Sequence, residues 1–224
     1  MPEFKQQSFE YMARVARAIG NKNRLLLLDL LAQRSYRVEM LARLSGMSVA
    51  NASKHLQSLR EAGLVQVSQS RNERLYRLAG DEIVELVTAL REVSETFVAE
   101  LKNLVQDTLG VDQDMRPVGP DELLQAQERG DVVVLDVRPG EEYEAGHIPG
   151  AINVPIDQLE DRLADIPKER EVVAYCRGPY CLWSTQAVEW LKAREHRARR
   201  LELGLPEWRA AGYDTETGDS SSDD

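Results

Sequence analysis

The chain has 224 residues, of which 29% are charged, and its formal net charge is −10. This length is enough for two domains with separate cores. Residues 1–110 hold 15 basic and 13 acidic side chains, whereas residues 111–224 hold 13 and 25, so the two halves are expected to meet different partners. Because neither a run of about 18 apolar residues nor a basic leader with an apolar core occurs, we expect a cytoplasmic protein that makes no membrane contact.

The first half of the chain predicts a small fold of helices around a tight turn. Apolar side chains recur at helical spacing over residues 8–19 and 24–33. A shorter helix is expected over residues 38–44, and Ser48 then caps another helix that ends at Gly63. Two helices joined by a tight glycine turn form the helix-turn-helix pattern, which is typical of DNA-binding proteins.

A β-hairpin is expected to follow these helices. Residues 64–68 and 74–78 alternate apolar and polar side chains around a polar tip, as two antiparallel strands do. Residues 21–80 carry ten basic and four acidic side chains, an excess that would attract DNA phosphates. The alternative for any one of these cations is a solvated position without a role. Taken together, the helices, hairpin and charge predict a mainly-α winged helix-turn-helix domain over residues 1–110.

A long helix is expected over residues 81–109. Its apolar side chains recur every three or four residues over roughly four heptads. A helix of this length after a small domain is typical of a dimer interface, so we expect a homodimer formed through residues 81–109 and the N-terminal helix. The alternative is that the helix only covers the core of its own domain.

The second half of the chain predicts an α/β domain with a parallel sheet. Buried strands alternate with amphipathic helices, an order that places helices on both faces of the sheet. The expected strands cover residues 132–137, 171–175 and 199–203, and the expected helices cover residues 157–166 and 182–194. Residues 111–119 are predicted to be a linker, residues 120–213 the domain, and residues 214–224 a disordered acidic tail.

The only two cysteines of the chain, Cys176 and Cys181, lie on one loop at the end of a predicted strand. Functional loops leave the carboxyl ends of strands in such sheets. Gly178 allows the backbone to curl, and a helix that begins near residue 182 would direct N–H groups at the sulfur, lowering a thiol pKa from about 8.5 into roughly the 3.5–7.5 range. Arg177 adds a positive charge nearby. The pattern therefore favours a reactive Cys176 over an inert buried cysteine.

Residues 44–65, with their Ser53-Lys54-His55-Leu56 segment and the Ala62-Gly63-Leu64-Val65 ending, resemble the helix-turn-helix of the ArsR family of dimeric bacterial repressors. The resemblance implies that Val49, Ser53 and Lys54 contact the bases of double-stranded operator DNA and that Arg71 lies at the wing tip. Short polar side chains at the start of a recognition helix let the backbone approach base edges. The candidate DNA contacts are Ser48, Val49, Asn51, Ser53, Lys54, Gln57, Arg71 and Arg74.

The metal sites of many ArsR relatives are missing from this sequence. Residues 38–42 contain no cysteine, and residues 81–109 contain no histidine. The carboxylates of residues 81–109 are better explained as a solvated helix face than as ligands. We therefore expect no metal and no cofactor. His55 is expected to have a packing role in preference to a phosphate contact.

Residues 135–155, the Cys176-Arg177-Gly178 segment and residues 204–213 resemble, in that order, the motifs of the rhodanese homology domain. The resemblance implies that Cys176 carries sulfane sulfur as a persulfide, within an active-site loop that also holds Arg177, Gly178, Pro179 and Tyr180. It also implies that Asp136 and Arg138 brace this loop and that His147 braces a turn. Phosphatases of the same fold have an arginine six residues after the cysteine, where this chain has Leu182, so sulfur chemistry is favoured over phosphate chemistry.

Cys181 distinguishes this loop from that of relatives with one cysteine. It could resolve a persulfide on Cys176 into a disulfide if the two Cα atoms lie within about 7 Å, or it could simply line the pocket. The favoured hypothesis is a DNA-binding repressor whose rhodanese domain senses or processes reactive sulfur, from a small sulfane-sulfur donor, through a Cys176 persulfide. The alternative is a thiosulfate or persulfide sulfurtransferase whose winged helix only sets its location.

Overall fold

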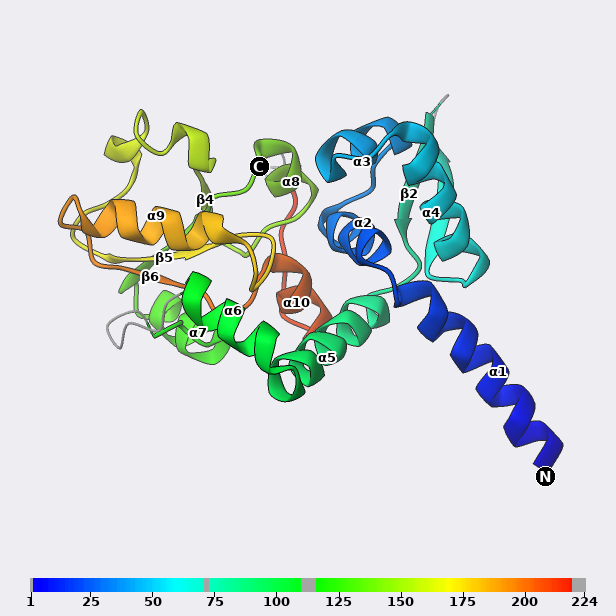
Figure 1. The fold of residues 1–224 in the computed structure, drawn as a ribbon. Coiled ribbons are helices and arrows are strands. Elements are labelled where there is room, and N and C mark those ends of the chain that lie inside the picture. The colour runs from blue at the N-terminus through cyan, green and yellow to red at the C-terminus, as the bar shows by residue number, and fades with distance from the viewer. Residues whose placement is uncertain (1, 71–72, 110–115, 219–224) are drawn as a thin grey trace. The chain divides into compact units, whose positions relative to one another are not determined.

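The computed structural model describes residues 2–70, 73–109 and 116–218 (Figure 1). The chain divides into two compact units, Met1–Val87 and Thr88–Asp224. The division falls inside helix α5 (Glu82–Phe97), and therefore earlier in the chain than the end of the expected first domain at residue 110. Among the described residues, no helix is both long enough and apolar enough to cross a membrane.

The first unit has the predicted order of helices followed by a hairpin, which confirms a winged helix-turn-helix fold. Its N-terminal helix begins before the expected residue 8, and the turn between α3 and α4 contains Gly46, whose φ of 67° suits glycine. Ser48 caps α4, because its side chain accepts a hydrogen bond from the Asn51 N–H. The elements are α1 (Pro2–Ile19), α2 (Lys22–Gln33), α3 (Val38–Ser45), α4 (Val49–Glu61), β1 (Val65–Ser70) and β2 (Glu73–Leu78).

Leucines from three helices form the core of the first unit. Leu27 of α2, Leu41 of α3, and Leu56 and Leu59 of α4 are fully buried, and burying each such side chain stabilises a fold by roughly 1.5–3 kcal/mol. Strands β1 and β2 pair antiparallel, with Val65 opposite Leu78. This core fixes α4 against the hairpin while its other face stays in solvent.

The prediction of a single long helix over residues 81–109 is wrong in one respect. The chain forms two helices there, α5 and α6 (Ala99–Leu109), which are separated at Val98. The Ser94 hydroxyl donates a hydrogen bond to the Leu90 carbonyl at 2.7 Å, a side-chain bond that competes with the helical pattern and often bends helices. Thr96 and Val98 are β-branched residues with reduced helix propensity. The sequence therefore weakens the helix where it breaks.

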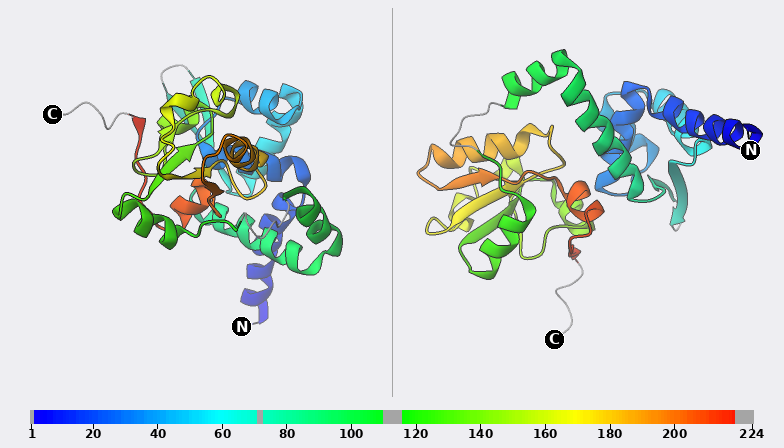
Figure 2. Two further views of the ribbon diagram at one scale, coloured as in Figure 1. Left: turned by 90° about the vertical axis from the view of Figure 1, so that its left-hand side faces the viewer. Right: turned by 90° about the horizontal axis from the view of Figure 1, so that it is seen from below.

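The second unit contains a four-stranded, entirely parallel sheet in the order β4-β3-β5-β6. Helix α9 covers one face, and helices α7 and α10 cover the other (Figures 1 and 2). Val134 and Leu135, which are neighbours on β3, point into opposite cores, as the alternation of a strand requires. The elements are α7 (Pro120–Glu128), β3 (Val132–Asp136), α8 (Gly140–Ala145), β4 (Ile152–Asn153), β5 (Glu171–Tyr175), α9 (Leu182–Lys192), β6 (Ala198–Arg200) and α10 (Leu205–Ala210).

Two further expectations for the second half differ from the structure. The helix expected over residues 157–166 is replaced by two 3₁₀ turns, Ile156–Gln158 and Leu163–Asp165. Ile166 is extended, because the proline that follows it disfavours helical backbone. The tail expected to be disordered from residue 214 is placed as far as residue 218, and Glu216 forms a β-bridge with His147. The rest of the predicted tail, residues 219–224, lies outside the described residues.

Candidate functional site

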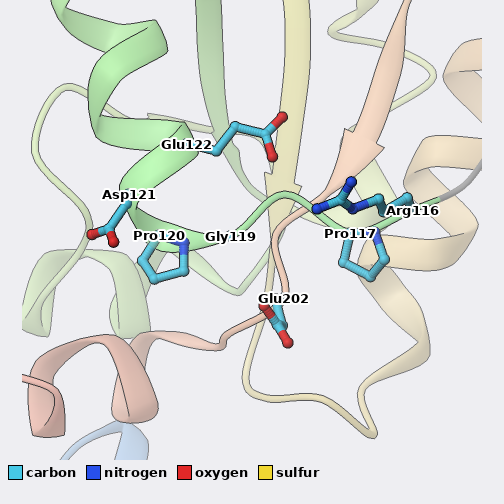
Figure 3. Close-up of a pocket in the computed structure, with 7 residues that line it drawn as sticks. All are labelled: Arg116, Pro117, Gly119, Pro120, Asp121, Glu122 and Glu202. Carbon is cyan, nitrogen blue, oxygen red and sulfur yellow. The ribbon is translucent and has the colours of Figure 1, made fainter.

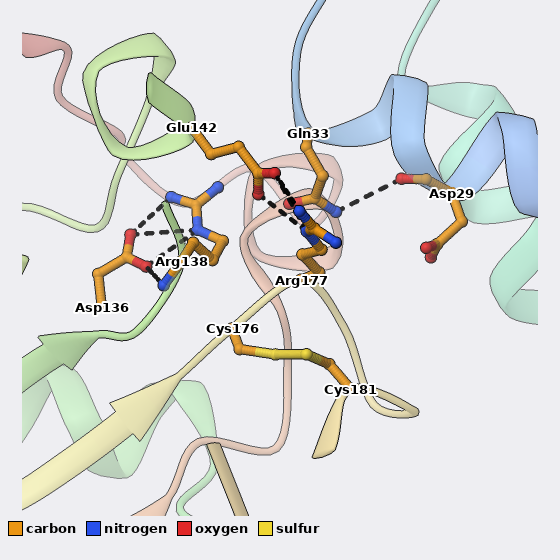
Figure 4. The surroundings of a disulfide bond; sticks show 8 residues. All are labelled: Asp29, Gln33, Asp136, Arg138, Glu142, Cys176, Arg177 and Cys181. Carbon is orange, nitrogen blue, oxygen red and sulfur yellow. Dashed lines mark hydrogen bonds and ion pairs between the residues drawn. A yellow bond between two sulfur atoms is a disulfide. The ribbon is translucent and has the colours of Figure 1, made fainter. Parts of the chain in front are cut away.

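The two cysteines meet at the carboxyl end of β5. Cys176 directly follows the strand and is 2% exposed, while Cys181 is the N-cap residue of α9. Their sulfurs are joined in a disulfide (Figure 4), and their Cα atoms lie 6.5 Å apart, within the range that a disulfide spans. The Cys181 N–H donates a hydrogen bond to the Gly178 carbonyl at 3.0 Å, which closes the loop. The spacing of five residues thus permits direct chemistry between the two sulfurs.

Gly204 packs closely against the backbone of the cysteine loop. A Cβ atom at Gly204 would lie 2.5 Å from the Gly178 nitrogen and Cα atoms, closer than any real side chain can approach. The next residue, Leu205, donates its N–H to the Cys176 carbonyl at 3.3 Å. The segment that precedes α10 is therefore part of the cysteine site, although the sequence analysis gave it no such position.

Gly204→Ala is expected to distort the loop, because the new methyl group would meet backbone atoms that cannot swing aside. We expect a loss of about 1–3 kcal/mol in stability and slower alkylation of Cys176 in the reduced protein. Gly140→Ala is the matched control, because a Cβ there meets only the Asn153 side chain at 3.7 Å. Thermal unfolding and the iodoacetamide reaction rate measure both effects. Equal behaviour of the two variants would contradict this role for Gly204.

The positive charge that Arg177 adds near Cys176 is paired with a carboxylate. Its guanidinium donates hydrogen bonds to both carboxylate oxygens of Glu142, the shortest at 2.6 Å (Figure 4). The same guanidinium lies 4.5 Å from the Trp183 ring centroid, a cation–π geometry. Since Glu142 is 2% exposed, the carboxylate and the guanidinium neutralise each other in a poorly solvated place.

A second carboxylate, that of Glu207, lies against the loop. One of its oxygens is 3.4 Å from the position that a Cβ at Gly178 would take. Its Oε1 atom pairs with Arg91 of α5 at 3.1 Å, whereas its buried Oε2 atom has no hydrogen-bond partner in the part of the chain that the structure describes. Arg91 and Glu207 both belong to the second unit. Glu142 and Glu207 could not be identified from the sequence, because only the tertiary fold brings them to the cysteine loop.

Asp136 and Arg138 form a buried network at the end of β3. Both side chains are completely buried, and they contact each other at 2.6 Å. The Tyr175 hydroxyl donates to Asp136 at 2.6 Å, and Arg138 donates to the Gly146 carbonyl at 2.7 Å. Burial, followed by the charge of Asp136, raises the pKa of Tyr175 well above its usual value, so the hydroxyl keeps its proton. This geometry suits the predicted bracing role, since Tyr175 immediately precedes Cys176.

His147 lies on the same side of the domain. Its ring stacks on the Tyr143 ring with a centroid distance of 3.8 Å. Its Nδ1 atom is 2.9 Å from the Tyr143 carbonyl, and its backbone pairs with Glu216. These contacts fit the predicted role of bracing a turn.

The candidate DNA contacts of α4 gather on its solvent face. Ser48, Val49, Ser53, Lys54 and Gln57 are exposed, and Asn51 is half-buried. Arg74 is exposed on β2, whereas Arg71 lies outside the described residues. The core of the unit does not need the described side chains of this set, so the face of α4 that carries them is available for a DNA major groove.

His55 turns away from this face. It is half-buried, and its Nε2 atom lies 3.4 Å from the Asn23 amide nitrogen. Burial, and then the charges of Arg24 and Lys54, lower its pKa. The ring is therefore neutral at pH 7, as the predicted packing role requires.

Lys54→Ala is expected to weaken operator binding to a similar extent for all DNA sequences if Lys54 contacts phosphate, and to reduce the salt slope of log K by about 1. A base contact would instead relax specificity at one position. Lys168→Ala is the control, because Lys168 is exposed in the second unit. Fluorescence anisotropy titrations at several salt concentrations measure both quantities. An unchanged affinity and slope would remove Lys54 from the DNA surface.

A hollow of ≈390 Å³ lies elsewhere in the second unit (Figure 3). Its lining includes neither cysteine, and Asp121, Glu122 and Glu202 outnumber Arg116 around it. Glu122 already pairs with Arg199 at 2.8 Å. In the described part of the chain, no group of three or more His, Cys, Asp or Glu side chains could hold a metal ion. The cysteine loop therefore remains the site with recognisable chemistry.

Comparison with known proteins gives matches for both units. The family described as "Bacterial regulatory protein, arsR family" matches residues 21–67, and "Rhodanese-like domain" matches residues 119–211. The chain is 41% identical, over 96% of its length and 94% of the relative, to the HTH-type transcriptional regulator Rv0324 of Mycobacterium tuberculosis. It is also 35% identical to a sulfurtransferase of Allochromatium vinosum, over 37% of this chain and 76% of that protein.

A solved structure also resembles the N-terminal part of the chain. It is the homodimeric winged helix-turn-helix DNA-binding domain of Mb0332 from Mycobacterium bovis. The two are 35% identical, with a TM-score of 0.40, and the match covers 42% of this chain and 87% of that one.

Proposed function

Because the chain belongs to the ArsR-type helix-turn-helix transcriptional regulators and carries a rhodanese-like domain after its DNA-binding unit, we propose that it is a cytoplasmic repressor whose operator affinity depends on sulfur chemistry at Cys176. The observation that carries this proposal is the cysteine loop itself. Cys176 ends β5, and its Cα atom lies 6.5 Å from that of Cys181, so a sulfur atom received by one residue can be passed on by the other.

The proposed chemistry needs no reagent beyond the donor. The Cys176 thiolate attacks the outer sulfur of a persulfide R–S–S–H, whose S–S bond breaks and releases the thiolate R–S⁻. Cys176 then carries –S–SH. The Cys181 thiolate next attacks the inner sulfur of this group, forming the Cys176–Cys181 disulfide and releasing HS⁻. The sulfane sulfur is reduced to sulfide, the two thiols are oxidised, and the disulfide is the lasting form of the signal.

The DNA-binding form is proposed to be a homodimer. Large apolar side chains lie exposed on α1 and on the α5–α6 segment, including Phe4, Met12, Phe97 and Leu104. Large apolar side chains that lie exposed along a helix are typical of a protein–protein interface. Pairing two copies through these helices would bury these side chains and present two copies of α4 to the two halves of an operator.

Helix α5 is the proposed route from the cysteines to the DNA-binding unit, because it includes residues of both units. Tyr180, which lies between the two cysteines, donates its hydroxyl to Glu95 of α5 at 2.7 Å. Burial, and then Glu95, raise the pKa of Tyr180, so the hydroxyl is protonated at neutral pH and can donate. One turn earlier on α5, Arg91 pairs with Glu207. A change in the loop would thus act on one face of α5 through two contacts.

Tyr180→Phe is expected to weaken the coupling between the cysteines and DNA without slowing the sulfur chemistry. Loss of one hydrogen bond to a charged group should reduce the difference in operator binding between reduced and oxidised protein by about 1 kcal/mol, roughly fivefold in Kd. Tyr213→Phe is the matched control, because its hydroxyl bonds Asp121 at 3.1 Å and not α5. Operator titrations of both redox forms measure the effect. If the two variants couple equally well, Tyr180 does not carry the signal.

The second candidate function is a sulfurtransferase enzyme for which the winged helix only sets location. The similarity of residues in the second unit to a sulfurtransferase favours it. Turnover would then pass sulfur from Cys176 to an external acceptor, and DNA affinity would not depend on the sulfur state. Cys181 would only line the pocket.

One set of assays separates the two functions. Operator affinity is measured for wild type, Cys176→Ser and Cys181→Ser, before and after polysulfide, alongside sulfur transfer from thiosulfate to cyanide. A sulfur-dependent affinity in wild type alone supports the repressor. Turnover with an unchanged affinity supports the enzyme and contradicts the proposed sensing.

A further inference from the structure

We infer that the Cys176 site takes its sulfur from a donor of low charge, an organic persulfide, and discriminates against small dianions such as thiosulfate. This inference rests on the proposed function and concerns the donor that the same loop accepts. It comes from the charges around the two cysteines, where three described guanidiniums, those of Arg91, Arg138 and Arg177, each pair with a carboxylate.

Three ion pairs surround the loop. Arg177, the cation of the loop itself, binds both oxygens of Glu142. Arg138 is buried against Asp136, which lies opposite Tyr175, the last residue of β5. Arg91 contacts Glu207 at 3.1 Å. These pairs leave no net positive charge among the six groups.

Two features shift the balance towards negative charge. One oxygen of the Glu207 carboxylate lies 3.4 Å from the position that a Cβ at Gly178 would take, and its buried Oε2 atom has no hydrogen-bond partner among the described residues. Glu95 is a further carboxylate, and it accepts the hydrogen bond of Tyr180 from within the loop. The three described ion pairs and Glu95 together contain three guanidiniums and four carboxylates, a formal charge of −1.

The charge of the sulfur donor determines how strongly the negative charge of the site repels it. The N-terminus of a helix provides about half a positive charge, which suits a single thiolate on Cys176 in front of α9. Thiosulfate would bring two more negative charges to that thiolate, and like charges in a poorly solvated place repel strongly. A protonated persulfide R–S–S–H brings none at its reacting end. Its S–S bond breaks with the electron pair leaving on R–S⁻, and the proton stays on the sulfur transferred to Cys176.

Persulfide formation on the reduced, full-length Cys181→Ser protein tests this inference, because no second thiol can remove the product. The rate of persulfide formation on Cys176 is measured with cysteine persulfide and with thiosulfate, by quenching the reaction and recording intact mass spectra. Each rate is then divided by the rate at which free cysteine reacts with the same donor under the same conditions. We expect the normalised rate to be at least tenfold higher for the persulfide. The thiosulfate rate should rise with added salt, since salt screens repulsion.

Glu207→Gln in the same background removes one negative charge and should raise the normalised thiosulfate rate about tenfold, with little effect on the persulfide rate. Glu189→Gln is the matched control, because Glu189 is exposed on α9 and should change neither rate. Equal normalised rates for the two donors, or a thiosulfate rate that neither salt nor Glu207→Gln alters, would overturn the inference while leaving the proposed function intact. If neither donor adds sulfur to Cys176, the proposed function itself is wrong.

Discussion

Replacing Cys176 with serine is expected to abolish persulfide formation and every change in operator affinity that depends on it. A hydroxyl cannot replace the thiolate that attacks sulfane sulfur, and no other cysteine can form a disulfide with Cys181. Operator affinity of the reduced protein should stay at the wild-type value, because Cys176 lies outside the DNA-binding unit. Mass spectrometry and anisotropy titrations before and after polysulfide measure the two effects.

Cys181→Ser is the comparison for this variant. It should still form the persulfide on Cys176 but should stop there, because the residue that resolves it is gone. In the wild type the disulfide closes a short loop, with a sequence separation of five, and should stabilise the oxidised form by about 2 kcal/mol. Neither variant should gain this increment on oxidation. A Cys181→Ser protein that still responds like wild type would show that Cys181 only lines the pocket.

Asp136→Asn is expected to cause the largest loss of stability, about 3–5 kcal/mol, because it removes the carboxylate charge that contacts the buried Arg138 guanidinium at 2.6 Å. The Tyr175 hydroxyl would also lose its charged acceptor. All three tryptophans, Trp183, Trp190 and Trp208, belong to the second unit. Thermal or urea unfolding followed by tryptophan fluorescence therefore reports on the unit that contains Asp136.

Asp165→Asn is the matched control for Asp136→Asn. Asp165 also pairs with an arginine, Arg162 at 2.8 Å, but both side chains are about half exposed. An exposed ion pair contributes only about 0–1 kcal/mol. Similar losses for the two variants would contradict the bracing role of Asp136 and Arg138.

The fold of the first unit follows closely from local sequence signals. Ser48 and Gly46 mark the helix boundaries by their own capping and backbone preferences, so the helix-turn-helix could be predicted without tertiary information. The break at Val98 could not be predicted from periodicity, because the apolar stripe continues across it. The structure shows a side-chain hydrogen bond of Ser94 to the helix backbone just before the break, which adds to the weak helix propensity of the β-branched Thr96 and Val98.

The short elements of the second unit could not be predicted from the periodicity of apolar residues either. Strand β4 has only two residues and α10 only six, too few for a repeating pattern to emerge. Both are held in place by the sheet and by the cysteine loop. Tertiary contacts, not intrinsic preference, determine these segments.

Part of the cysteine site could likewise be predicted from the sequence, and part is seen only in the structure. The position of Cys176 after a buried strand and its spacing from Cys181 are properties of the sequence, and the structure places the two residues together. The ion pair between Glu142 and Arg177 could not be predicted in this way, because the two residues are 35 positions apart in the sequence. The sequence shows a cation beside a cysteine, and only the fold shows that a buried carboxylate neutralises it.

The most direct test of sulfur-dependent DNA binding is the operator affinity of the wild-type protein before and after polysulfide, with Cys176→Ser alongside. We expect polysulfide to change the wild-type Kd by at least about fivefold, reduction to restore it, and the Cys176→Ser protein to show no change. An unchanged wild-type Kd, in a sample whose Cys176–Cys181 disulfide is confirmed by mass spectrometry, would mean that operator binding does not depend on sulfur chemistry at Cys176.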